Sequence, residues 1–180
     1  MRDFQHLSQY KLPYTASICQ KLRFAAWYFT GRLLIACFIP GTWWRKSILR
    51  LFGARIGHGG RFKPRLMISC PWMLSVGDHC WIGENVWIDN LAPVVIGNNV
   101  CLSQGSYFCT GNHDYRKSTF DLRLTSIIVE SEAWIAAYSV LAPGTHVCSG
   151  AVVALASVVS GQIPSGVIVR GNPAKIVGVR

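Results

Sequence analysis

Aliphatic positions recur every six residues along most of this chain. Written in sixes from Val129, the sequence reads VESEAW, IAAYSV, LAPGTH, VCSGAV, VALASV, VSGQIP, and every block opens with an aliphatic residue. The second residue is small, polar or acidic, and the fifth is small in all blocks but the last. A period of six fits neither an α-helix nor a simple alternating strand. It predicts a short strand and a tight corner, with one aliphatic side chain per strand pointing inward.

The same period runs upstream, with a two-residue shift between sets. The near-copies VGDHCW, IGENVW and IGNNVC mark it, and glycine or asparagine follows the aliphatic residue where we expect a corner with positive φ. Three such strands close a triangular coil of about 18 residues, and successive coils pair as parallel strands. A β-sandwich would not keep a strict six over so many blocks. The pattern predicts an all-β fold, a parallel β-helix of hexapeptide repeats. The upstream positions are Ile56, Phe62, Ile68 and Leu74, then Val76, Ile82 and Ile88, then Ile96, Leu102 and Phe108.

The repeat stops between residues 109 and 128 and resumes at Val129. The interrupted stretch begins CTGNHDYRKSTF and obeys no period. Residues 56–108 supply about three coils and residues 129–164 supply two, so the break is a loop of about twenty residues leaving the solenoid. Loops of this length without regular structure are usually functional. We therefore expect a protruding active-site loop at 109–128.

The first third of the chain has a different pattern. Residues 1–50 contain ten aromatic and eight basic residues against one acid, Asp3. The apolar run from Phe24 to Gly41 is interrupted by Arg32, which argues for a buried or interfacial helix rather than a membrane span. We expect a helical segment over 1–50 that caps the first coil of a β-helix domain over 51–180. A compatible alternative is peripheral contact with an anionic membrane, through Trp43, Trp44, Arg45, Lys46 and Arg50.

Composition and charge narrow these classes further. The chain has 180 residues, 51% hydrophobic and 14% charged, which argues for one folded domain with an extension. The net charge is +10, and all the excess lies in residues 1–65. Seven cysteines without a C-x-x-C spacing, and no signal peptide, predict reduced thiols in a cytoplasmic protein. No base-reading module is present, so we expect no nucleic-acid partner.

The motifs in combination resemble a known family. The hexapeptide blocks, the loop GNHDY, the resumption IIVESEAWIAAYSVLAPG and the closing VIVRGNPAKIV are similar to the left-handed β-helix, or hexapeptide-repeat, acyltransferases. Within them, the chain most resembles the colanic acid biosynthesis-type and nodulation-type O-acetyltransferases over roughly residues 45–178. The resemblance implies left-handed coils, acetyl-CoA as co-substrate, no metal requirement, and a saccharide acceptor, free or lipid-linked. It also implies a homotrimer whose coenzyme site lies between adjacent β-helices.

The chemistry of such an enzyme needs few groups. A sugar hydroxyl must lose its proton as it attacks a thioester, and one imidazole with a near-neutral pKa can accept that proton. His113, in GNHDY, stands where this family carries its general base. The family holds the oxyanion with a backbone N–H that corresponds to Ala137. Transfer is then direct, and no cysteine is needed as a nucleophile.

Further positions follow from the resemblance. Asp89 stands where galactoside and maltose acetyltransferases place an asparagine that contacts the acceptor. Its carboxylate would bind a hydroxyl, orient His113, or lie solvated at a corner. Gly161 stands where relatives often carry a lysine, which weakens one phosphate contact. The implied coenzyme-binding residues are Trp134, Ala137, Leu155, Ser160, Arg170 and Lys175.

Three alternatives remain open beside this reading. A β-helix carbonic anhydrase would use His79 and His113, but position 118 is a serine where the family's second loop histidine is needed. A non-catalytic β-helix would serve as an assembly module. The same site would also serve N-acetyl or other acyl transfer. We expect an acetyl-CoA-dependent O-acetyltransferase acting on a cell-surface or exopolysaccharide sugar or its lipid-linked precursor. We expect it in the cytoplasm or at the inner face of the membrane.

Overall fold

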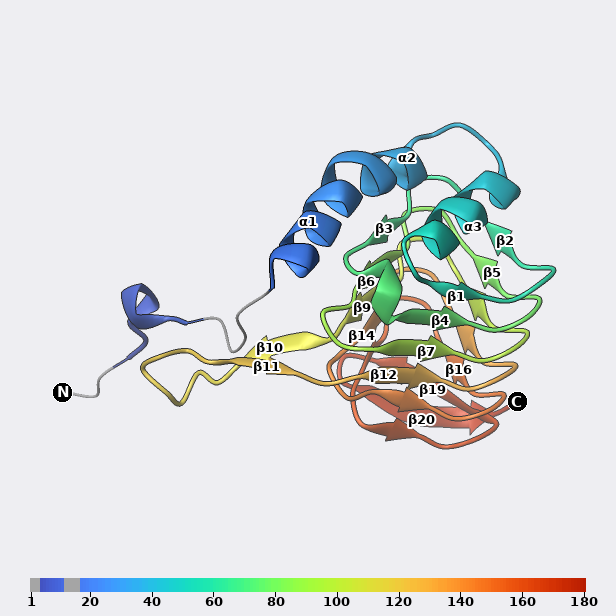
Figure 1. Ribbon diagram of the computed structural model, residues 1–180. Helices are drawn as coiled ribbons and strands as arrows, with labels where there is room; N and C mark the ends of the chain where they lie inside the picture. Colours follow the sequence, from blue (N-terminus) through green and yellow to red (C-terminus); the bar gives the residue numbers. More distant parts are fainter. Residues whose placement is uncertain (1–3, 12–16) are drawn as a thin grey trace.

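Three flat sheets of parallel strands wind around one core (Figure 1). The computed structural model describes residues 4–11 and 17–180. Each coil gives one strand to each sheet, and the chain is a left-handed parallel β-helix, as predicted. Sheet A contains β1 (Arg55–Ile56), β4 (Leu74–Val76), β7 (Val94–Ile96), β12 (Ile127–Val129), β15 (His146–Val147) and β18 (Gln162–Ile163).

The other two sheets form the remaining sides of the triangle. Sheet B contains β2 (Arg61–Phe62), β5 (Trp81–Ile82), β8 (Cys101–Leu102), β13 (Trp134–Ile135), β16 (Val152–Val153), β19 (Val167–Gly171) and β20 (Ala174–Val179). Only β20 runs antiparallel to its neighbour there, because the chain turns back on β19 and ends the solenoid. Sheet C contains β3 (Met67–Ile68), β6 (Trp87–Asp89), β9 (Tyr107–Cys109), β14 (Val140–Leu141) and β17 (Val158–Val159).

Coil length varies along the solenoid. Successive coils take 20, 20, 33, 18 and 16 residues, as the register of sheet A shows from Arg55 through Ser75, Val95, Ile128 and His146 to Gln162. The predicted 18 therefore holds for one coil. In each of the first two coils, the two extra residues lie at the corner after sheet C. The short 3-10 helix η3 (Pro71–Met73) forms the first of these corners. The 33-residue coil contains the interruption of the repeat.

The core is a single column of inward side chains. Most strands of the repeat contribute one or two buried aliphatic or aromatic residues, and most of their neighbours point outward because side chains alternate along a strand. The helices close the N-terminal end of this column with Trp27, Ile35 and Leu49. The predicted inward positions that are buried include Phe62, Ile68, Leu74, Val76, Ile82, Ile88, Ile96, Leu102, Phe108, Val129, Ile135, Leu141, Val147, Val153 and Val159.

Glycine and asparagine have different jobs at the corners. Asn85 and Asn99 have φ of 56° and 55°, as expected of a left-handed corner. Gly77, directly after its aliphatic residue, does not have positive φ, so that part of the prediction is wrong. A Cβ on Gly77 would lie 2.3 Å from Asn98 Oδ1 and 2.7 Å from the carbonyl oxygen of Gly97. Glycine is needed there because the next coil passes too close for any side chain.

A layer of helices covers the N-terminal end of the solenoid (Figure 1). It contains α1 (Ile18–Ala26), the π-helical η2 (Trp27–Gly31), α2 (Arg32–Ala36) and α3 (Thr42–Leu51); a 3-10 turn, η1 (Leu7–Gln9), lies further upstream. Ser17 caps α1 and shares a capping box with Gln20. Residues 1–3 and 12–16 of the predicted N-terminal segment lie outside the described residues. In the described part of the chain, no helix is long and apolar enough to cross a bilayer.

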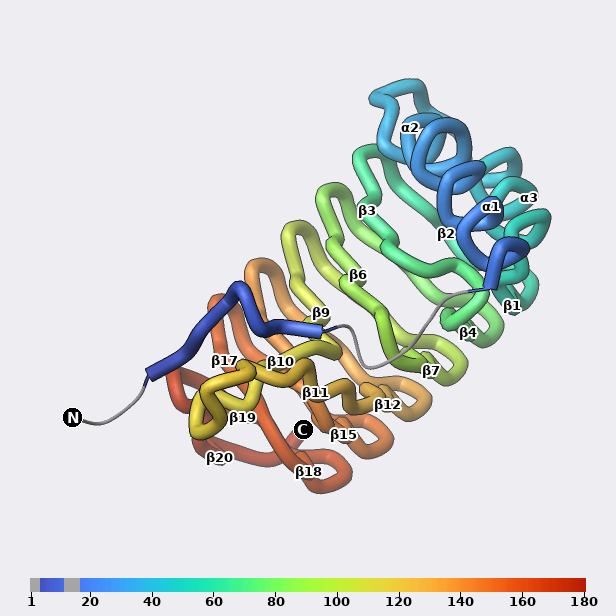
Figure 2. Tube along the Cα trace, turned by 60° about the vertical axis from the view of Figure 1, so that its left-hand side comes forward, coloured from blue at the N-terminus to red at the C-terminus, as the bar shows by residue number. Residues whose placement is uncertain are grey.

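The interruption of the repeat is a β-hairpin rather than an irregular loop. Strands β10 (Gly111–His113) and β11 (Leu122–Leu124) pair antiparallel and project from the solenoid. Strand pairing resumes at Ile127, two residues before the expected end of the loop, and the predicted frame at Val129 is confirmed because Val129 is buried and pairs with Ile96. The N-terminal segment crosses the hairpin (Figure 2), and the backbone N–H of His6 donates to the carbonyl of Ser118 at 2.7 Å.

Candidate active site

His113 ends strand β10 and its ring is held by Phe120. The Nδ1 atom lies 2.8 Å from the carbonyl oxygen of Phe120, and the two rings stack with centroids 4.2 Å apart and planes within 6°. A carbonyl oxygen can only accept a hydrogen bond, so Nδ1 must carry the proton. In the neutral ring Nε2 then has a free lone pair. This arrangement makes Nε2 the nitrogen that can accept a proton from a substrate.

Thr110 anchors the base of the hairpin to the solenoid. It is buried, and its hydroxyl donates to the carbonyl of Asp89 at 2.9 Å and accepts from the N–H of Ala92 at 3.2 Å. The N–H of Thr125 donates to the carbonyl of Thr110 at 2.9 Å, which closes the base. The hairpin that carries His113 is therefore bonded at its base to the preceding coil as well as to its own.

Two ion pairs hold the outer part of the hairpin. Asp114, next to His113, is buried and pairs with Arg123 on β11. Lys117 and Asp121 form a second, exposed pair at 2.8 Å. The hydrogen bond from Lys117 lowers the pKa of Asp121. The pair at Asp114 is the stronger constraint because its carboxylate is buried, whereas the Arg123 side chain is 64% exposed.

Tyr10 approaches His113 from the N-terminal segment. The edge of one ring faces the other, with centroids 5.7 Å apart and planes at 62°. The imidazole therefore lies between Phe120 on one side and Tyr10 on another. No pattern in the sequence pointed to Tyr10, because residues 4–11 follow no repeat.

Asp89 lies one coil before the hairpin, at the end of β6. It pairs in register with Cys109, and its Oδ1 accepts a hydrogen bond from the Ser69 hydroxyl at 2.7 Å. Burial, then Cys109 and Asp89, raise the pKa of Tyr107. Within the described residues, Asp89 makes no hydrogen bond to His113. The partner that orients the imidazole is the Phe120 carbonyl.

A groove of about 530 Å³ runs over the outer face of sheet B. Its walls come from β13, β16 and β19 and from the corners that follow β8, β13 and β16. Four of the six residues predicted to bind the coenzyme line it: Trp134, Ala137, Leu155 and Arg170. The structure thus brings together residues that are 36 positions apart in the chain, on successive coils.

Two groups in the groove can contact a ligand: the ring of Trp134 and the backbone N–H of Ala137. Trp134 lies outside the core, half exposed, and its Nε1 donates to the Ser103 hydroxyl at 2.9 Å. The backbone N–H of Ala137 donates no hydrogen bond to any described residue, whereas the N–H groups of Ala136 and Tyr138 on either side are both used. Ala137 therefore presents a free donor at the corner after β13.

The groove has cationic ends. Arg170 and Lys175 are register partners across β19 and β20, so both side chains leave the same face of the sheet. A second hollow, of about 290 Å³, shares Ser103 with the groove and extends it to Arg61 and Lys63. The predicted contact Ser160 is different. It is exposed at the corner after β17 and does not line the groove.

His113 and the groove lie at different corners of one chain. The groove occupies sheet B and its junction with sheet C. The hairpin leaves after β9 in sheet C and returns at β12 in sheet A. A whole side of the triangle therefore separates the candidate base from the candidate coenzyme groove.

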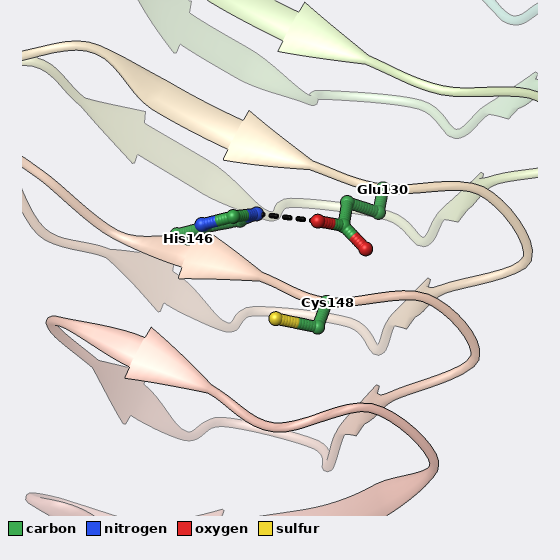
Figure 3. A group of neighbouring side chains, drawn as sticks. All are labelled: Glu130, His146 and Cys148. Atoms are coloured by element: carbon green, nitrogen blue, oxygen red, sulfur yellow. Dashed lines mark hydrogen bonds and ion pairs between the residues drawn. The ribbon is translucent and has the colours of Figure 1, made fainter.

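One cluster of possible metal ligands occurs in the described part of the chain. Glu130, His146 and Cys148 lie on the outside of sheet A, with ligand atoms within 4.8 Å of one another (Figure 3). Glu130 Oε1 is 2.7 Å from His146 Nε2, and Oε2 accepts from the N–H and hydroxyl of Ser149. Both carboxylate oxygens are thus already bonded. Hydrogen bonds account for this arrangement, and His113 is not part of it.

Comparisons with known proteins identify acetyltransferases as relatives of this chain. A scan of protein-family models finds no match. The chain is 39% identical over 137 residues to the colanic acid biosynthesis acetyltransferase WcaF of Escherichia coli K12, covering 76% of this chain and 75% of the relative. It is 24% identical over 137 residues to the galactoside O-acetyltransferase of the same strain, covering 74% and 67%.

Solved structures extend the likeness to nearly the whole chain. The hexapeptide-repeat acetyltransferase VCA0836 of Vibrio cholerae, solved with acetyl coenzyme A, superposes with a TM-score of 0.84 at 25% identity, covering 91% of this chain and 90% of that one. A galactoside acetyltransferase in complex with coenzyme A superposes with a TM-score of 0.75 at 20% identity, covering 96% and 88%. The second likeness is one of fold.

Proposed function

Because the chain belongs to the hexapeptide-repeat acetyltransferases, we propose that it moves the acetyl group of acetyl-CoA to a hydroxyl of a saccharide. The acceptor is a sugar of a cell-surface polysaccharide or its lipid-linked precursor. This choice rests on WcaF, whose name assigns it to colanic acid biosynthesis, and on a second relative named for lipopolysaccharide biosynthesis, 26% identical over 117 residues.

His113 is the general base of this proposal. The observation that supports it is the hydrogen bond from Nδ1 to the Phe120 carbonyl, which leaves Nε2 to accept a proton. The acceptor oxygen attacks the thioester carbon as its proton moves to Nε2. The carbon–sulfur bond then breaks, and the departing sulfur takes that proton from the imidazolium. Transfer is direct, and no acyl-enzyme forms.

The groove on sheet B is the proposed coenzyme site. Trp134 and Leu155 offer apolar contact to the pantetheine arm, and Arg170 with Lys175 offers positive charge to the phosphates. The unused N–H of Ala137 stabilises the oxyanion of the tetrahedral intermediate. Ser160, outside the groove of its own chain, remains a candidate contact across a subunit boundary.

The same geometry supports a homotrimer as part of this proposal. Since His113 and the groove of one chain face different corners, a complete site needs the hairpin of one subunit beside the groove of the next. Asp89, half-buried near the base of the hairpin, is the proposed acceptor contact through a sugar hydroxyl. Cyclic symmetry would repeat this arrangement three times.

The test is release of free thiol from acetyl-CoA with fucosyl, galactosyl and glucosyl acceptors. Wild type should release thiol only with a suitable acceptor, and His113→Ala should lower kcat by about 10²–10⁴-fold. Binding of acetyl-CoA to His113→Ala should stay within about threefold of wild type, because the base lies outside the proposed groove.

Several results would change this assignment. Thiol release that persists in His113→Ala would remove the base from the mechanism. An amino-sugar acceptor that outperforms every hydroxyl acceptor would favour N-acetyl transfer on the same fold. Absence of acetyl-CoA binding together with absence of turnover would leave the non-catalytic assembly module.

A further inference from the structure

The continuous helix from α1 through α2 is apolar on two opposite faces. Trp27, Gly31 and Ile35, four residues apart, pack against the solenoid. Ile18, Leu22, Phe29 and Leu33 lie about half a turn away and form a stripe on the outer side. A surface helix of a soluble domain normally places polar residues there, and one that is apolar all round is normally covered.

The connection between α2 and α3 adds to this surface and is rigidly held. Arg45 is buried without an acidic partner, and it donates to the carbonyls of Ile35, Cys37, Ile39 and Gly41. Burial lowers the pKa of the Arg45 guanidinium, and these carbonyl dipoles hold its charge. The contacts fix residues 37–41 in place, so the exposed Phe38 belongs to a rigid connection; Trp43, at the start of α3, is exposed as well.

We name these outward residues the cap surface. Each of its side chains is at least 65% exposed, and all lie on the helical layer over the N-terminal end of the solenoid. The residues are Ile18, Leu22, Phe29, Leu33, Phe38 and Trp43. An apolar patch of this kind marks a contact surface rather than random exposure.

The charge around the cap surface has one sign. No aspartate or glutamate occurs between residues 4 and 77. Arg23 and Arg55 line a hollow of about 420 Å³ beside α1, where the Arg23 guanidinium also lies 4.4 Å over the Trp72 ring. The Lys and Arg residues of this stretch are Lys11, Lys21, Arg23, Arg32, Arg45, Lys46, Arg50, Arg55, Arg61, Lys63 and Arg65.

We propose that the cap surface binds the surface of an anionic phospholipid bilayer. Apolar and aromatic side chains enter the headgroup boundary, and the surrounding lysines and arginines contact lipid phosphates. Trp43 suits this boundary because its ring is apolar and its N–H is polar. A second copy of the chain fits less well, because two such cap surfaces would bring like charges together.

This inference deepens the proposed function, on which its biological meaning rests. An acetyltransferase that lies on a bilayer meets lipid-linked saccharides in two dimensions rather than three. The segment 4–11, which contacts the His113 hairpin through His6 and Tyr10, continues in the chain toward α1. The proposal therefore selects the lipid-linked form of the acceptor.

Vesicle flotation tests the proposal. The full chain should float with phosphatidylcholine vesicles that contain about 30% phosphatidylglycerol at about 0.1 M salt, and much less with phosphatidylcholine alone. The triple variant Leu22→Gln, Phe29→Gln, Leu33→Gln should lose at least about tenfold in partitioning. The variant Lys21→Gln, Lys46→Gln, Arg55→Gln should lose the preference for anionic lipid.

A matched control removes apolar surface from the other end of the solenoid. The exposed residues Ile176, Val177 and Val179 on β20, changed together to glutamine, should leave flotation unchanged. Flotation that is absent in wild type, or equal in the cap and control variants, overturns the proposal. A cap variant that lowers the sedimenting mass, with no wild-type flotation, would assign the surface to a second copy.

His113→Ala separates this proposal from the proposed function. The variant should float as wild type does, since His113 does not belong to the cap surface. Flotation of wild type without turnover would support the membrane-binding surface and reject the proposed enzyme activity. Turnover on soluble saccharides without flotation would support the enzyme activity and reject the membrane-binding surface.

Discussion

One hydrogen bond determines which nitrogen of His113 can act as a base. The histidine itself stood out in the sequence because it fell in the only gap of a regular repeat and in a motif shared with a family. Its partner did not, because Phe120 acts through a backbone carbonyl that any residue would provide. What the sequence could not predict is the fold of the hairpin, which places that carbonyl beside Nδ1.

Burial and the nearby Asp89 shift the pKa of the Cys70 thiol. Burial, followed by the charge of Asp89, raises the pKa of the Cys70 thiol from 9.0 to about 12. Above about pH 9 the unfolded chain ionises this thiol and the folded chain does not, so raising the pH favours unfolding. The free energy of unfolding should fall by up to about 1.4 kcal/mol more between pH 9 and pH 10 in wild type than in Cys70→Ala.

Urea unfolding at both pH values measures this difference. Because the comparison is between pH values, the constant cost of the smaller alanine side chain cancels. The exposed Cys19 supplies the control, and Cys19→Ala should keep the pH dependence of wild type. An identical slope in wild type and Cys70→Ala would contradict the raised pKa.

At the scale of the element, the hairpin offers a matched pair of ionic contacts. Arg123 pairs with the buried Asp114, beside His113, whereas Lys117 pairs with Asp121 in solvent. Arg123→Gln leaves a buried carboxylate without its partner, which displaces the strand that holds His113. We expect kcat to fall about tenfold or more, with the melting temperature of the solenoid little changed.

Lys117→Gln is the control for that experiment. It removes the same charge from the same hairpin, but an exposed pair contributes at most about 1 kcal/mol, so turnover should stay within about twofold. Equal losses in Arg123→Gln and Lys117→Gln would mean that net charge, rather than the pairing of the buried Asp114, governs the hairpin. Turnover by the thiol assay and thermal unfolding by circular dichroism give both readings.

The elements that follow the repeat were predictable, and those that leave it were not. The aliphatic residue of every block predicted the strands, because one side of each strand must fill the core. The hairpin lies outside the period, so its strands were missed and the end of the loop was placed two residues late, whereas the frame at Val129 was correct. The role of Gly77 was misread because a close approach between coils has no signature in one coil alone.

Arg45 illustrates a second kind of miss. In the sequence it belonged to a basic, aromatic run that suited contact with an anionic membrane. In the structure it is buried among carbonyls at the end of α2 and shapes the turn before α3. Residue type gives the charge, but only the path of the connecting chain decides whether that charge is inside.

At the scale of the whole molecule, the separation of His113 from the groove predicts that subunits share sites. Mixing His113→Ala subunits with Leu155→Trp subunits, which have a blocked groove, should restore activity that neither variant shows alone. In random trimers, three quarters are mixed and each has one intact interface of three. Recovery should therefore approach about a quarter of wild-type turnover.

Refolding the two variants together and assaying thiol release measures the recovery. Variants that are refolded separately and then combined are the control, since they form no mixed trimers. If joint refolding restores nothing while mixed trimers are present by native mass spectrometry, base and groove belong to the same subunit. Sedimentation of wild type at three times the monomer mass would establish the trimer itself.

The coil that carries the hairpin keeps its register on both sides. Val94 and Val95 pair with Ile127 and Ile128 as neighbours in an unbroken ladder would. The hairpin is thus an insertion that leaves the pairing of the solenoid strands unchanged. Such an arrangement is modular: the proposed coenzyme groove on sheet B can stay fixed while the hairpin that carries His113 is exchanged. Grafting hairpins between relatives should then change the preferred acceptor without rebuilding the proposed coenzyme site.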